Sequence, residues 1–278
     1  MMGDIIPTQC GMVELRWGER TYVMGVLNLA PDSFSGDGLG GDVEQALSRA
    51  RMFQEEGVDI IDVGGESTRP GSTPVSVEEE LGRVIPAIER IVGEVGVPIS
   101  IDTYKSEVAR RAIDSGAGMI NDIWGLKYDP RIADVAREYR VPLIIVQNQR
   151  NRPYNDFFPE LIRGLRWSIG IALERGVQEG NIIIDPGIGF GKTPEQNLEI
   201  TRRLGELKGL GRPILIGPSR KSVIGLVLDL PVDQRLEGTA AAVAIGIANG
   251  ADMVRVHDAR EMVRVTRMSD AIVRGKIW

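Results

Sequence analysis

The chain has 278 residues, 42% of them hydrophobic and 26% charged, which suffices for the core of one large α/β barrel of typically about 250 residues. Its net charge of -6 argues against a general nucleic-acid surface, and no window holds the roughly 18 uninterrupted apolar residues of a membrane helix. One cysteine, Cys10, excludes an internal disulfide, and one histidine, His257, makes a zinc site unexpected. The N-terminus lacks a signal-peptide core, so we expect a cytoplasmic protein.

The first 20 residues predict a short β-hairpin that closes the bottom of a barrel. Residues 12–17 form its first strand, Gly18 and Glu19 its turn, and Arg20 begins the second strand. Buried strands and helices then alternate. The expected strands are residues 22–27, 59–63, 98–101, 119–120, 141–146, 182–184, 213–217 and 253–256. The expected helices include residues 43–56, 105–115, 130–139, 158–175 and 194–207. A further helix begins after Ser76, which forms a capping box with Glu79. A broken helical region at 222–249 and a final helix end the chain.

These are about eight βα units without a composition break, so we expect one domain over residues 1–278. Strands that alternate with helices form a parallel sheet, and eight units in one chain predict an α/β fold, a single (β/α)8 TIM barrel with an N-terminal β-hairpin. An open doubly wound sheet would carry a glycine-rich dinucleotide fingerprint after its first strand. Here that turn, residues 28–33, reads Asn-Leu-Ala-Pro-Asp-Ser instead.

Polar residues stand at almost every strand end, where barrels of this kind place their catalytic groups. Asp102, Asn121 and Asp185 suit a flat heterocycle with several N–H groups and a carbonyl. A second set suits a polyanion, and the amide oxygen of Asn28 also suits a divalent cation. The members of that second set are Asn28, Arg69, Arg255 and His257. For Asp62 we expect a supporting role, such as partnering a basic group, and Asp122 suits a loop cap as well as a ligand contact.

Loops follow two of these ends. The long segment 29–41 is typical of a functional loop, and we expect it and segment 64–74 to fold over the site. After the β-branched run 182–184, Asp185 and Pro186 end the strand, and glycines, Phe190 and Lys192 follow. Buried charge at Asp185 needs a partner, for which Lys192 and Lys221 are the candidates before a ligand arrives.

Seven motifs in chain order resemble those of the dihydropteroate synthase family and span nearly the whole chain. They are Met24-Gly25-Val26-Leu27-Asn28 with Pro31-Asp32-Ser33-Phe34-Ser35, Gly64-Gly65-Glu66-Ser67-Thr68-Arg69-Pro70-Gly71, Ile101-Asp102, Asn121-Asp122, Asp185-Pro186-Gly187-Ile188-Gly189-Phe190-Gly191-Lys192, Ser219-Arg220-Lys221-Ser222 and Arg255-Val256-His257-Asp258. The resemblance implies a folate-pathway transferase. It joins 6-hydroxymethyl-7,8-dihydropterin diphosphate to p-aminobenzoate and releases diphosphate in the presence of Mg²⁺.

The resemblance also implies roles for individual residues. Asp102, Asn121, Asp185 and Lys221 match the pterin-binding positions, and Asn28, Arg255 and His257 match the diphosphate and Mg²⁺ site. Thr68, Pro70, Phe190, Lys221 and Ser222 match the p-aminobenzoate side, and Arg69 and Gly217 complete the substrate-binding set. As catalytic residues we expect Asp102, Asn121, Asp185, Lys221, Arg255 and His257. Because Arg255 and His257 would meet only the anion, their removal should weaken binding of the diphosphate ester far more than binding of the free hydroxymethyl pterin.

The chain departs from the family pattern at three places. Ala30 stands where the family usually has Thr, and the Asp-Gly-Gly run after Ser35 is spread over residues 36–41. The fifth strand end reads Gln147-Asn148 where the family commonly has His-Met, so Asn148 replaces an apolar contact with the pterin ring by a polar one. None of these changes removes a residue of the diphosphate or p-aminobenzoate site.

Two other functions are consistent with a pterin-binding barrel: a non-catalytic pterin-binding paralogue, and a pterin-dependent methyltransferase. Methyl transfer releases no diphosphate, so the motifs at 219–222 and 255–257 and the Ser-Thr-Arg-Pro loop favour the synthase. Segment 238–250 is dense in Ala, Gly, Val and Ile. With the last helix it predicts an isologous homodimer surface, which the resemblance also implies.

Overall fold

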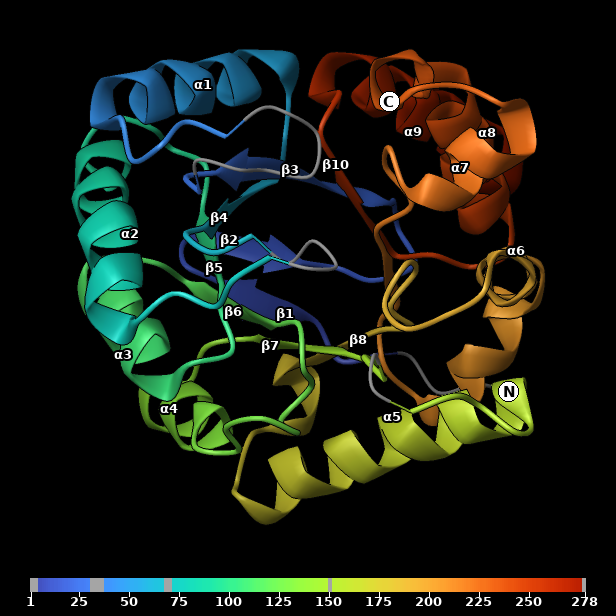
Figure 1. Ribbon diagram of the computed structural model, residues 1–278, viewed down its shortest axis with the longest axis horizontal. Helices are drawn as coiled ribbons and strands as arrows, with labels where there is room; N and C mark the ends of the chain where they lie inside the picture. The colour runs from blue at the N-terminus through green and yellow to red at the C-terminus, as the bar shows by residue number, and fades with distance from the viewer. Residues whose placement is uncertain (1–4, 31–37, 68–71, 150–151, 277–278) are drawn as a thin grey trace.

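The computed structural model describes residues 5–30, 38–67, 72–149 and 152–276. A ring of parallel strands is enclosed by helices, as Figure 1 shows. The strands are β1 (Thr8–Cys10), β2 (Val13–Leu15), β3 (Tyr22–Asn28), β4 (Ile60–Gly64), β5 (Ile99–Asp102), β6 (Met119–Asp122), β7 (Leu143–Val146), β8 (Ile182–Asp185), β9 (Leu215–Ile216) and β10 (Met253–Val256). The helices are α1 (Val43–Glu56), α2 (Val77–Val92), α3 (Ser106–Asp114), α4 (Ile132–Tyr139), α5 (Phe157–Glu174), α6 (Pro194–Arg203), α7 (Ser222–Leu228), α8 (Leu236–Ala248) and α9 (Ala259–Arg274), with short 3-10 turns at Glu179–Asn181, Leu204–Leu210 and Val232–Gln234.

The sheet is a closed barrel, which confirms the predicted fold class. Its strand order is β8-β7-β6-β5-β4-β3-β10-β9, and all of its strand pairs are parallel. The two end strands meet at a parallel bridge between Ile184 and Ile214, where the Ile184 N–H donates to the carbonyl of Pro213 at 3.0 Å. Because all eight strands run parallel, their C-terminal ends lie at the same end of the barrel.

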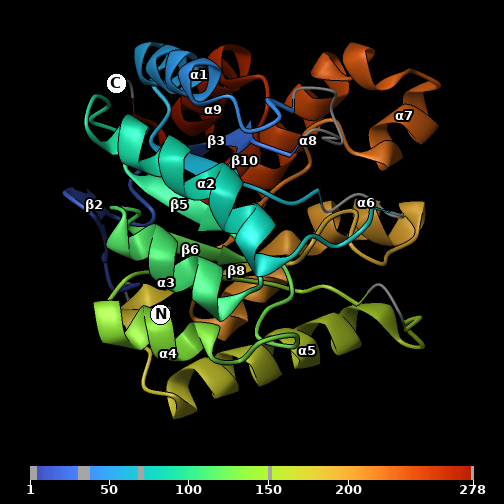
Figure 2. The ribbon, with the colours of Figure 1, turned by 60° about the vertical axis from the view of Figure 1, so that its left-hand side comes forward.

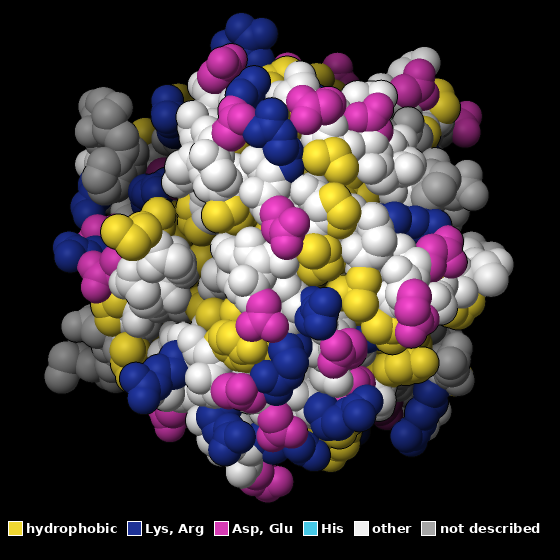
Figure 3. All heavy atoms as spheres, turned by 90° about the vertical axis from the view of Figure 1, so that its left-hand side faces the viewer, with side chains coloured by type: hydrophobic (Ala, Val, Ile, Leu, Met, Phe, Trp, Pro, Cys, Tyr) yellow, Lys and Arg dark blue, Asp and Glu magenta, His cyan; other side chains and the backbone are white. Residues whose placement is uncertain are grey.

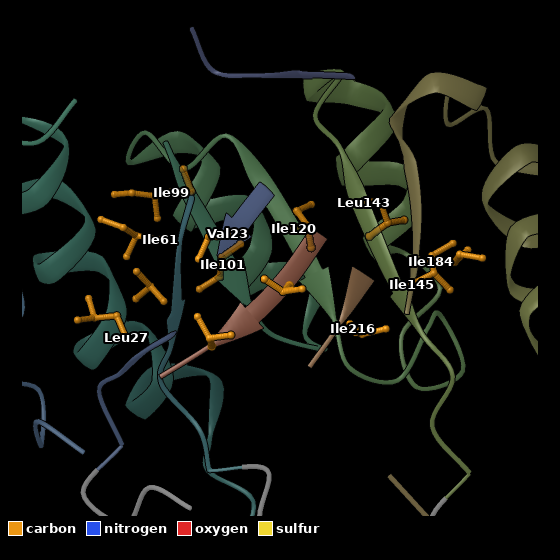
Figure 4. Close-up of a cluster of buried hydrophobic side chains, with 14 of the residues drawn as sticks. Val23, Leu27, Ile61, Ile99, Ile101, Ile120, Leu143, Ile145, Ile184 and Ile216 are labelled. Atoms are coloured by element: carbon orange, nitrogen blue, oxygen red, sulfur yellow. The ribbon is translucent and has the colours of Figure 1, made fainter. Parts of the chain in front are cut away.

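Side chains of each strand alternate between the barrel interior and the surrounding helices. Outward-facing residues such as Val23, Ile61 and Ile145 pack under the helices in one continuous core (Figure 4). Inward-facing residues such as Met24 and Ile183 fill the barrel. This period of two means that Asp102, Asn121 and Asp185 sit on the inner face of their strands, since each is an even number of residues from an inward-facing position.

The N-terminal hairpin is present, but its turn is not where the sequence analysis put it. β1 and β2 pair antiparallel around Gly11 and Met12, and Gly11 has φ +55°. The prediction of a turn at Gly18 and Glu19 is therefore wrong, since that segment leads from β2 into the first barrel strand. The correct signal was Gly11, whose left-handed backbone suits a two-residue turn.

The hairpin closes the N-terminal end of the barrel, as expected. Cys10 and Leu15 are fully buried in the same cluster as Tyr22 and Met24. The N–H of Arg16 donates to the hydroxyl of Tyr22 at 2.6 Å. In Figure 2 the hairpin and helix α7 lie at opposite ends of the barrel. The C-terminal strand ends are thus the end left for a ligand.

Helix boundaries follow local capping chemistry. Asp42 caps α1 by accepting from the Gln45 N–H, and Gly57 ends that helix with φ 86°. Ser76 caps α2 by accepting from the Glu79 N–H, and a complete capping box joins Thr193 and Gln196 at the start of α6.

The surface is mixed in charge where Figure 3 shows it. Acidic and basic side chains alternate over the face that α2 and α3 cover, and that face carries no large region of one sign. None of the helices in the described part of the chain is both long and apolar enough to cross a membrane.

Candidate active site

Four strand-end residues lie side by side in one row across the inner face of the barrel. The parallel register pairs Asn28 with Gly64, Gly64 with Asp102, and Asp102 with Asn121. Gly64 has no side chain, and a Cβ there would lie 3.7 Å from Asp102 Oδ2 and 3.9 Å from Asn28 Oδ1. The glycine therefore lies between an amide oxygen and a carboxylate, and two of the predicted site residues, Asn28 and Asp102, approach the same point from either side of it.

Arg255 joins Asp102, a member of this row, to Asp62, which lies two residues before the end of β4. Its Nε donates to Asp62 Oδ2 at 2.6 Å and its Nη2 to Asp102 Oδ2 at 2.7 Å. Asp62 is fully buried, so the expectation that it partners a basic group is confirmed. That Arg255 meets only the anionic part of a ligand stays a prediction, but its guanidinium also binds Asp102, a residue of the predicted pterin set, so its role is not confined to the anion. The physical reason is that buried carboxylates require a cation, and Arg255 projects inward at their level.

Burial dominates the electrostatics of this group. It raises the pKa of Asp102 to about 7, an effect that Arg255 reduces and that the carboxylate of Asp62 strengthens. For Arg255, burial alone would lower the pKa, but the charges of Asp62 and Asp102 outweigh it and hold the pKa above its ordinary value. The arginine is thus a permanent cation between two carboxyl groups.

Three buried acceptor atoms at this level have no hydrogen-bond partner among the described residues: Asp62 Oδ1, Asp102 Oδ1 and Asn121 Oδ1. The amide of Asn121 donates from Nδ2 to Asp62 Oδ2 at 2.9 Å, which leaves its carbonyl oxygen as an acceptor. Buried acceptors without donors are costly. A ligand with several N–H groups would satisfy them.

Asp185 supplies a further carboxylate from β8. It is 6% exposed, and its Oδ1 accepts from the Gly187 N–H at 2.7 Å. Burial raises the pKa of Asp185 to about 6, against the opposing effects of that hydrogen bond and of Lys221, Lys192 and Arg255. No cation in the described part of the chain lies within ion-pair distance of it, so the two candidate lysines act on Asp185 through space.

Lys192 stabilises the loop that follows β8. Its Nζ donates to the carbonyls of Gln147 at 2.8 Å and Phe190 at 3.1 Å. Burial lowers the pKa of Lys192 to about 7. Gly187 has φ +74°, and a Cβ there would lie 2.3 Å from the Gln147 carbonyl oxygen. Only glycine fits that position, so its place in the sequence has a steric cause.

Lys221 and Phe190 approach each other at the mouth of the barrel. The Nζ of Lys221 lies 4.5 Å from the centre of the Phe190 ring, in cation–π geometry. The loop is close-packed here, since a Cβ on Gly189 would lie 3.0 Å from Lys221 Cδ. A Cβ on Gly217 would be in ordinary contact with Arg255, 3.8 Å from its Cβ, and Ser222 begins α7. These predicted residues are therefore brought together by two successive loops.

His257 and the Ser219–Ser222 loop are linked directly. The ring Nδ1 of His257 lies 3.0 Å from Ser219 Oγ, and the His257 backbone N–H donates to the same oxygen at 3.2 Å. Arg220, with φ +56°, forms a bidentate ion pair with Asp258. Neither Ser219 nor Arg220 has a role predicted from sequence, because contacts between segments 38 residues apart are not visible in the chain order.

Several expectations fall outside what the structure describes. Thr68, Arg69 and Pro70 lie outside the described residues, as does most of the 29–41 loop.

Asp122 is a loop cap, since it accepts from the Trp124 N–H at 2.9 Å and the Leu126 N–H at 2.6 Å. No cluster of three or more His, Cys, Asp or Glu residues suitable for a metal occurs in the described ranges.

The chain matches the family model described as "Pterin binding enzyme" over residues 24–257. It is 51% identical to the dihydropteroate synthase of Bacillus subtilis over 259 residues, which is 93% of this chain and 91% of that protein. The chain belongs to the dihydropteroate synthase family. It is accordingly an enzyme, a transferase of folate biosynthesis.

Solved structures of the family share this fold. The Clostridium difficile dihydropteroate synthase, determined in the presence of pteroic acid, is 49% identical and superposes with a TM-score of 0.88 over 93% of this chain and 98% of that one. The Xanthomonas albilineans dihydropteroate synthase with 4-aminobenzoic acid is 38% identical, with a TM-score of 0.88 over 96% of this chain and 97% of that one.

Gln147, which follows β7, has defined contacts with a helix and with a lysine. Its side chain points outward from the barrel, where a Cβ on Gly164 of α5 would lie 2.4 Å from Gln147 Nε2. Its Oε1 accepts from Lys127 Nζ at 2.6 Å, and burial lowers the pKa of Lys127 to about 8. Lys127 was not predicted from the sequence, because a single lysine in the loop after a strand is a weak signal. Gln147 therefore packs between the barrel and α5 and does not face the barrel interior. The next residue, Asn148, is also buried.

Proposed function

We propose that the polar row binds the pterin ring of 6-hydroxymethyl-7,8-dihydropterin diphosphate through Asp102, Asn121, Asp185 and Lys221. The observation that carries this proposal is the set of buried acceptors described above, on Asp102 and Asn121, with Asp185 nearby. A 2-amino-4-oxo ring offers N–H donors on one edge, and carboxylates accept such bonds strongly. Its carbonyl needs a donor, for which the ammonium of Lys221 is the candidate.

The p-aminobenzoate side is proposed to lie at the Phe190–Lys221 contact, with Ser222, Thr68 and Pro70. An aromatic carboxylate suits a ring beside an ammonium, because the ring stacks while the cation attracts the carboxylate. The 4-aminobenzoic acid bound by the Xanthomonas albilineans relative supports this choice of substrate.

The diphosphate and Mg²⁺ are assigned to Asn28 and His257, together with Arg69 and Arg255. Mg²⁺ often keeps its waters and binds through few protein oxygens plus substrate phosphates, so one amide oxygen could serve as its protein ligand. Asn28 Oδ1 lies at the strand ends, 3.9 Å from the position of a Cβ on Gly64, and an amide oxygen there suits such a role. When bound, the metal would neutralise charge on the leaving diphosphate.

The chain's residues act on the reaction mainly through electrostatics. A bond forms between the amine nitrogen of p-aminobenzoate and the pterin methylene carbon, the carbon–oxygen bond to diphosphate breaks, and the amine loses a proton. Asp102 and Asp185 place negative charge beside the pterin ring, over which the positive charge of the methylene spreads as the bond to diphosphate breaks, and His257 donates toward the departing anion. Burial of these groups excludes water that would otherwise compete with the amine.

Assembly as a homodimer is proposed through α8 and α9. Ile245 is 51% exposed, Met268 61% and Ile272 72%, and these side chains come from two helices that pack together. Figure 1 shows α7, α8 and α9 on the same side of the barrel. Exposed apolar residues on one face favour a self-complementary contact.

Calorimetry with 6-hydroxymethylpterin tests the assignment of the pterin pocket. Asn121→Leu removes one buried acceptor and should weaken binding at least about tenfold, the equivalent of one hydrogen bond. Asp122→Asn is the matched control, because Asp122 is the next residue but caps a loop on the opposite face of the strand. Equal affinities in the wild type and Asn121→Leu would place the pterin elsewhere.

A further inference from the structure

Lys105 forms the centre of a buried ionic cluster that the proposed mechanism does not use. Its Nζ donates to Glu66 Oε2 at 2.6 Å, to Glu80 Oε2 at 2.6 Å and to the carbonyl of Val75 at 2.8 Å. An ammonium has three donors, so all of them are satisfied. The side chains of Lys105, Glu66 and Glu80 are 11%, 10% and 1% exposed. A cluster so buried holds one geometry, unlike an exposed ion pair.

The three acceptors of Lys105 come from two different places in the chain. Glu66 and Val75 belong to the segment between β4 and α2, one near each end of it, whereas Glu80 is in the first turns of α2. Lys105 itself precedes α3. One ammonium therefore joins both ends of the 66–75 segment to each other and to the end of β5.

Further contacts fix the same segment at its base. The hydroxyl of Tyr104 donates to Glu66 Oε1 at 2.7 Å, and Arg83 donates to the carbonyl of Gly65 at 2.7 Å. Gly65 packs so tightly on α2 that a Cβ would lie 2.7 Å from Val84 Cγ1. The Oγ of Ser72 donates to the carbonyl of Ser67 at 2.6 Å. The ends of the segment are thus held together up to residues 67 and 72.

The cluster is continuous with the pterin row. Asp102 is the last residue of β5, and Tyr104 and Lys105 follow it within three residues. The segment that they hold carries Thr68 and Pro70, which are assigned to p-aminobenzoate and lie outside the described residues. The cluster therefore connects the strand end that meets one substrate with the segment assigned to the other.

We propose that Lys105 is a positioning residue for p-aminobenzoate, which it never touches, because its ammonium fixes both ends of the 66–75 segment against the end of β5. The proposal rests on the function proposed above. It distinguishes the two substrates: removal of the clamp should affect the p-aminobenzoate side and leave the pterin side, which is built on strand ends, unchanged.

Steady-state kinetics of Lys105→Met tests this. We expect the KM for p-aminobenzoate to rise about tenfold or more, since small displacements of binding groups are costly, while kcat stays within about threefold. The Kd of 6-hydroxymethylpterin should stay within about twofold of wild type. Arg110→Met is the matched control, because Arg110 lies in α3 and pairs with Glu138 at the surface. An unchanged KM in a folded Lys105→Met enzyme, or equal losses for both ligands, would overturn the proposal.

A second pair of variants keeps the test decisive if Lys105→Met does not fold. Glu66→Gln and Glu80→Gln each neutralise one carboxylate, keep its shape and leave Lys105 one charged partner. Only Glu66 lies in the 66–75 segment, so Glu66→Gln should raise the KM for p-aminobenzoate about threefold or more and Glu80→Gln should not, because a neutral bond is weaker than a charged one. Equal effects of the two variants would contradict the positioning role. A wild-type enzyme without turnover would instead refute the proposed function.

Discussion

Arg255 shows at the residue scale how a side chain can serve both halves of the site. It holds Asp62 and Asp102 at 2.6 and 2.7 Å, so Arg255→Ala leaves two buried carboxylates without a cation. We therefore expect Arg255→Ala to weaken both 6-hydroxymethylpterin and its diphosphate ester about tenfold or more, and to destabilise the fold, because breaking a buried pair is costly. His257→Ala should weaken the ester alone. Calorimetry with both ligands checks this, and selective loss of the ester in Arg255→Ala would contradict it.

Substitution of Asp185 should weaken pterin binding strongly. Asp185→Asn keeps the shape but turns one acceptor oxygen into a donor that faces the donors of the pterin. The loss should be on the order of 2–4 kcal/mol of binding, since a charged hydrogen bond is replaced by a donor–donor contact. That is roughly a thirtyfold to thousandfold rise in Kd. Calorimetry with a pterin analogue measures it, and near-normal affinity in a folded variant would sink the assignment.

The carboxyl group of Asp185 also makes the stability of the protein depend on pH. Its pKa rises on folding from 3.8 to about 6, so the folded state holds the proton more tightly than the unfolded state. The stability due to protonation is complete below pH 3.8 and is lost as the pH rises through 6. Asparagine does not titrate, so the melting temperature of ligand-free Asp185→Asn relative to wild type should increase between about pH 4 and 7 and then level off. A pH-independent difference would show that Asp185 is not desolvated.

The hairpin illustrates the element scale, because it acts on stability and lies at the end of the barrel opposite the site. Leu15 is fully buried inside the barrel, whereas Met12 at the turn is 98% exposed. Leu15→Ala should lower the free energy of unfolding by about 2–5 kcal/mol, as expected for a buried leucine, and should leave pterin affinity unchanged. Met12→Ala is the control and should change neither. Urea denaturation measures the effect, and a stability equal to wild type would mean that the hairpin does not contribute to the core.

Most elements could be predicted from sequence because their signals are local. Buried strands such as 182–184 show as β-branched runs, and the period of two then indicates that Asp102 and Asn121 point inward. The contacts between distant strand ends could not be predicted. Nothing in the chain order shows that Arg255 reaches Asp62 and Asp102, since that depends on the closure of the barrel and on charge balance inside it. Lys105 was likewise visible only as the start of a helix.

Assembly belongs to the scale of the whole molecule. If α8 and α9 form the dimer surface, a charge at Ile272, which is 72% exposed, should be buried against its symmetry mate and dissociate the dimer. We expect the wild type to be a dimer at micromolar concentration in light scattering and Ile272→Glu to be a folded monomer. Met12→Glu, on the hairpin, is the control and should remain a dimer. A monomeric wild type would reject the proposed surface.

In the proposed reaction, one barrel holds a pterin diphosphate on its strand ends and transfers the pterin to p-aminobenzoate. Diphosphate release from 6-hydroxymethyl-7,8-dihydropterin diphosphate, measured with Mg²⁺ in the presence and absence of p-aminobenzoate, tests it most directly. The predicted result is release that requires p-aminobenzoate and matches the amount of 7,8-dihydropteroate formed. Release at the same rate without p-aminobenzoate, or binding of the pterin without any release, would contradict it.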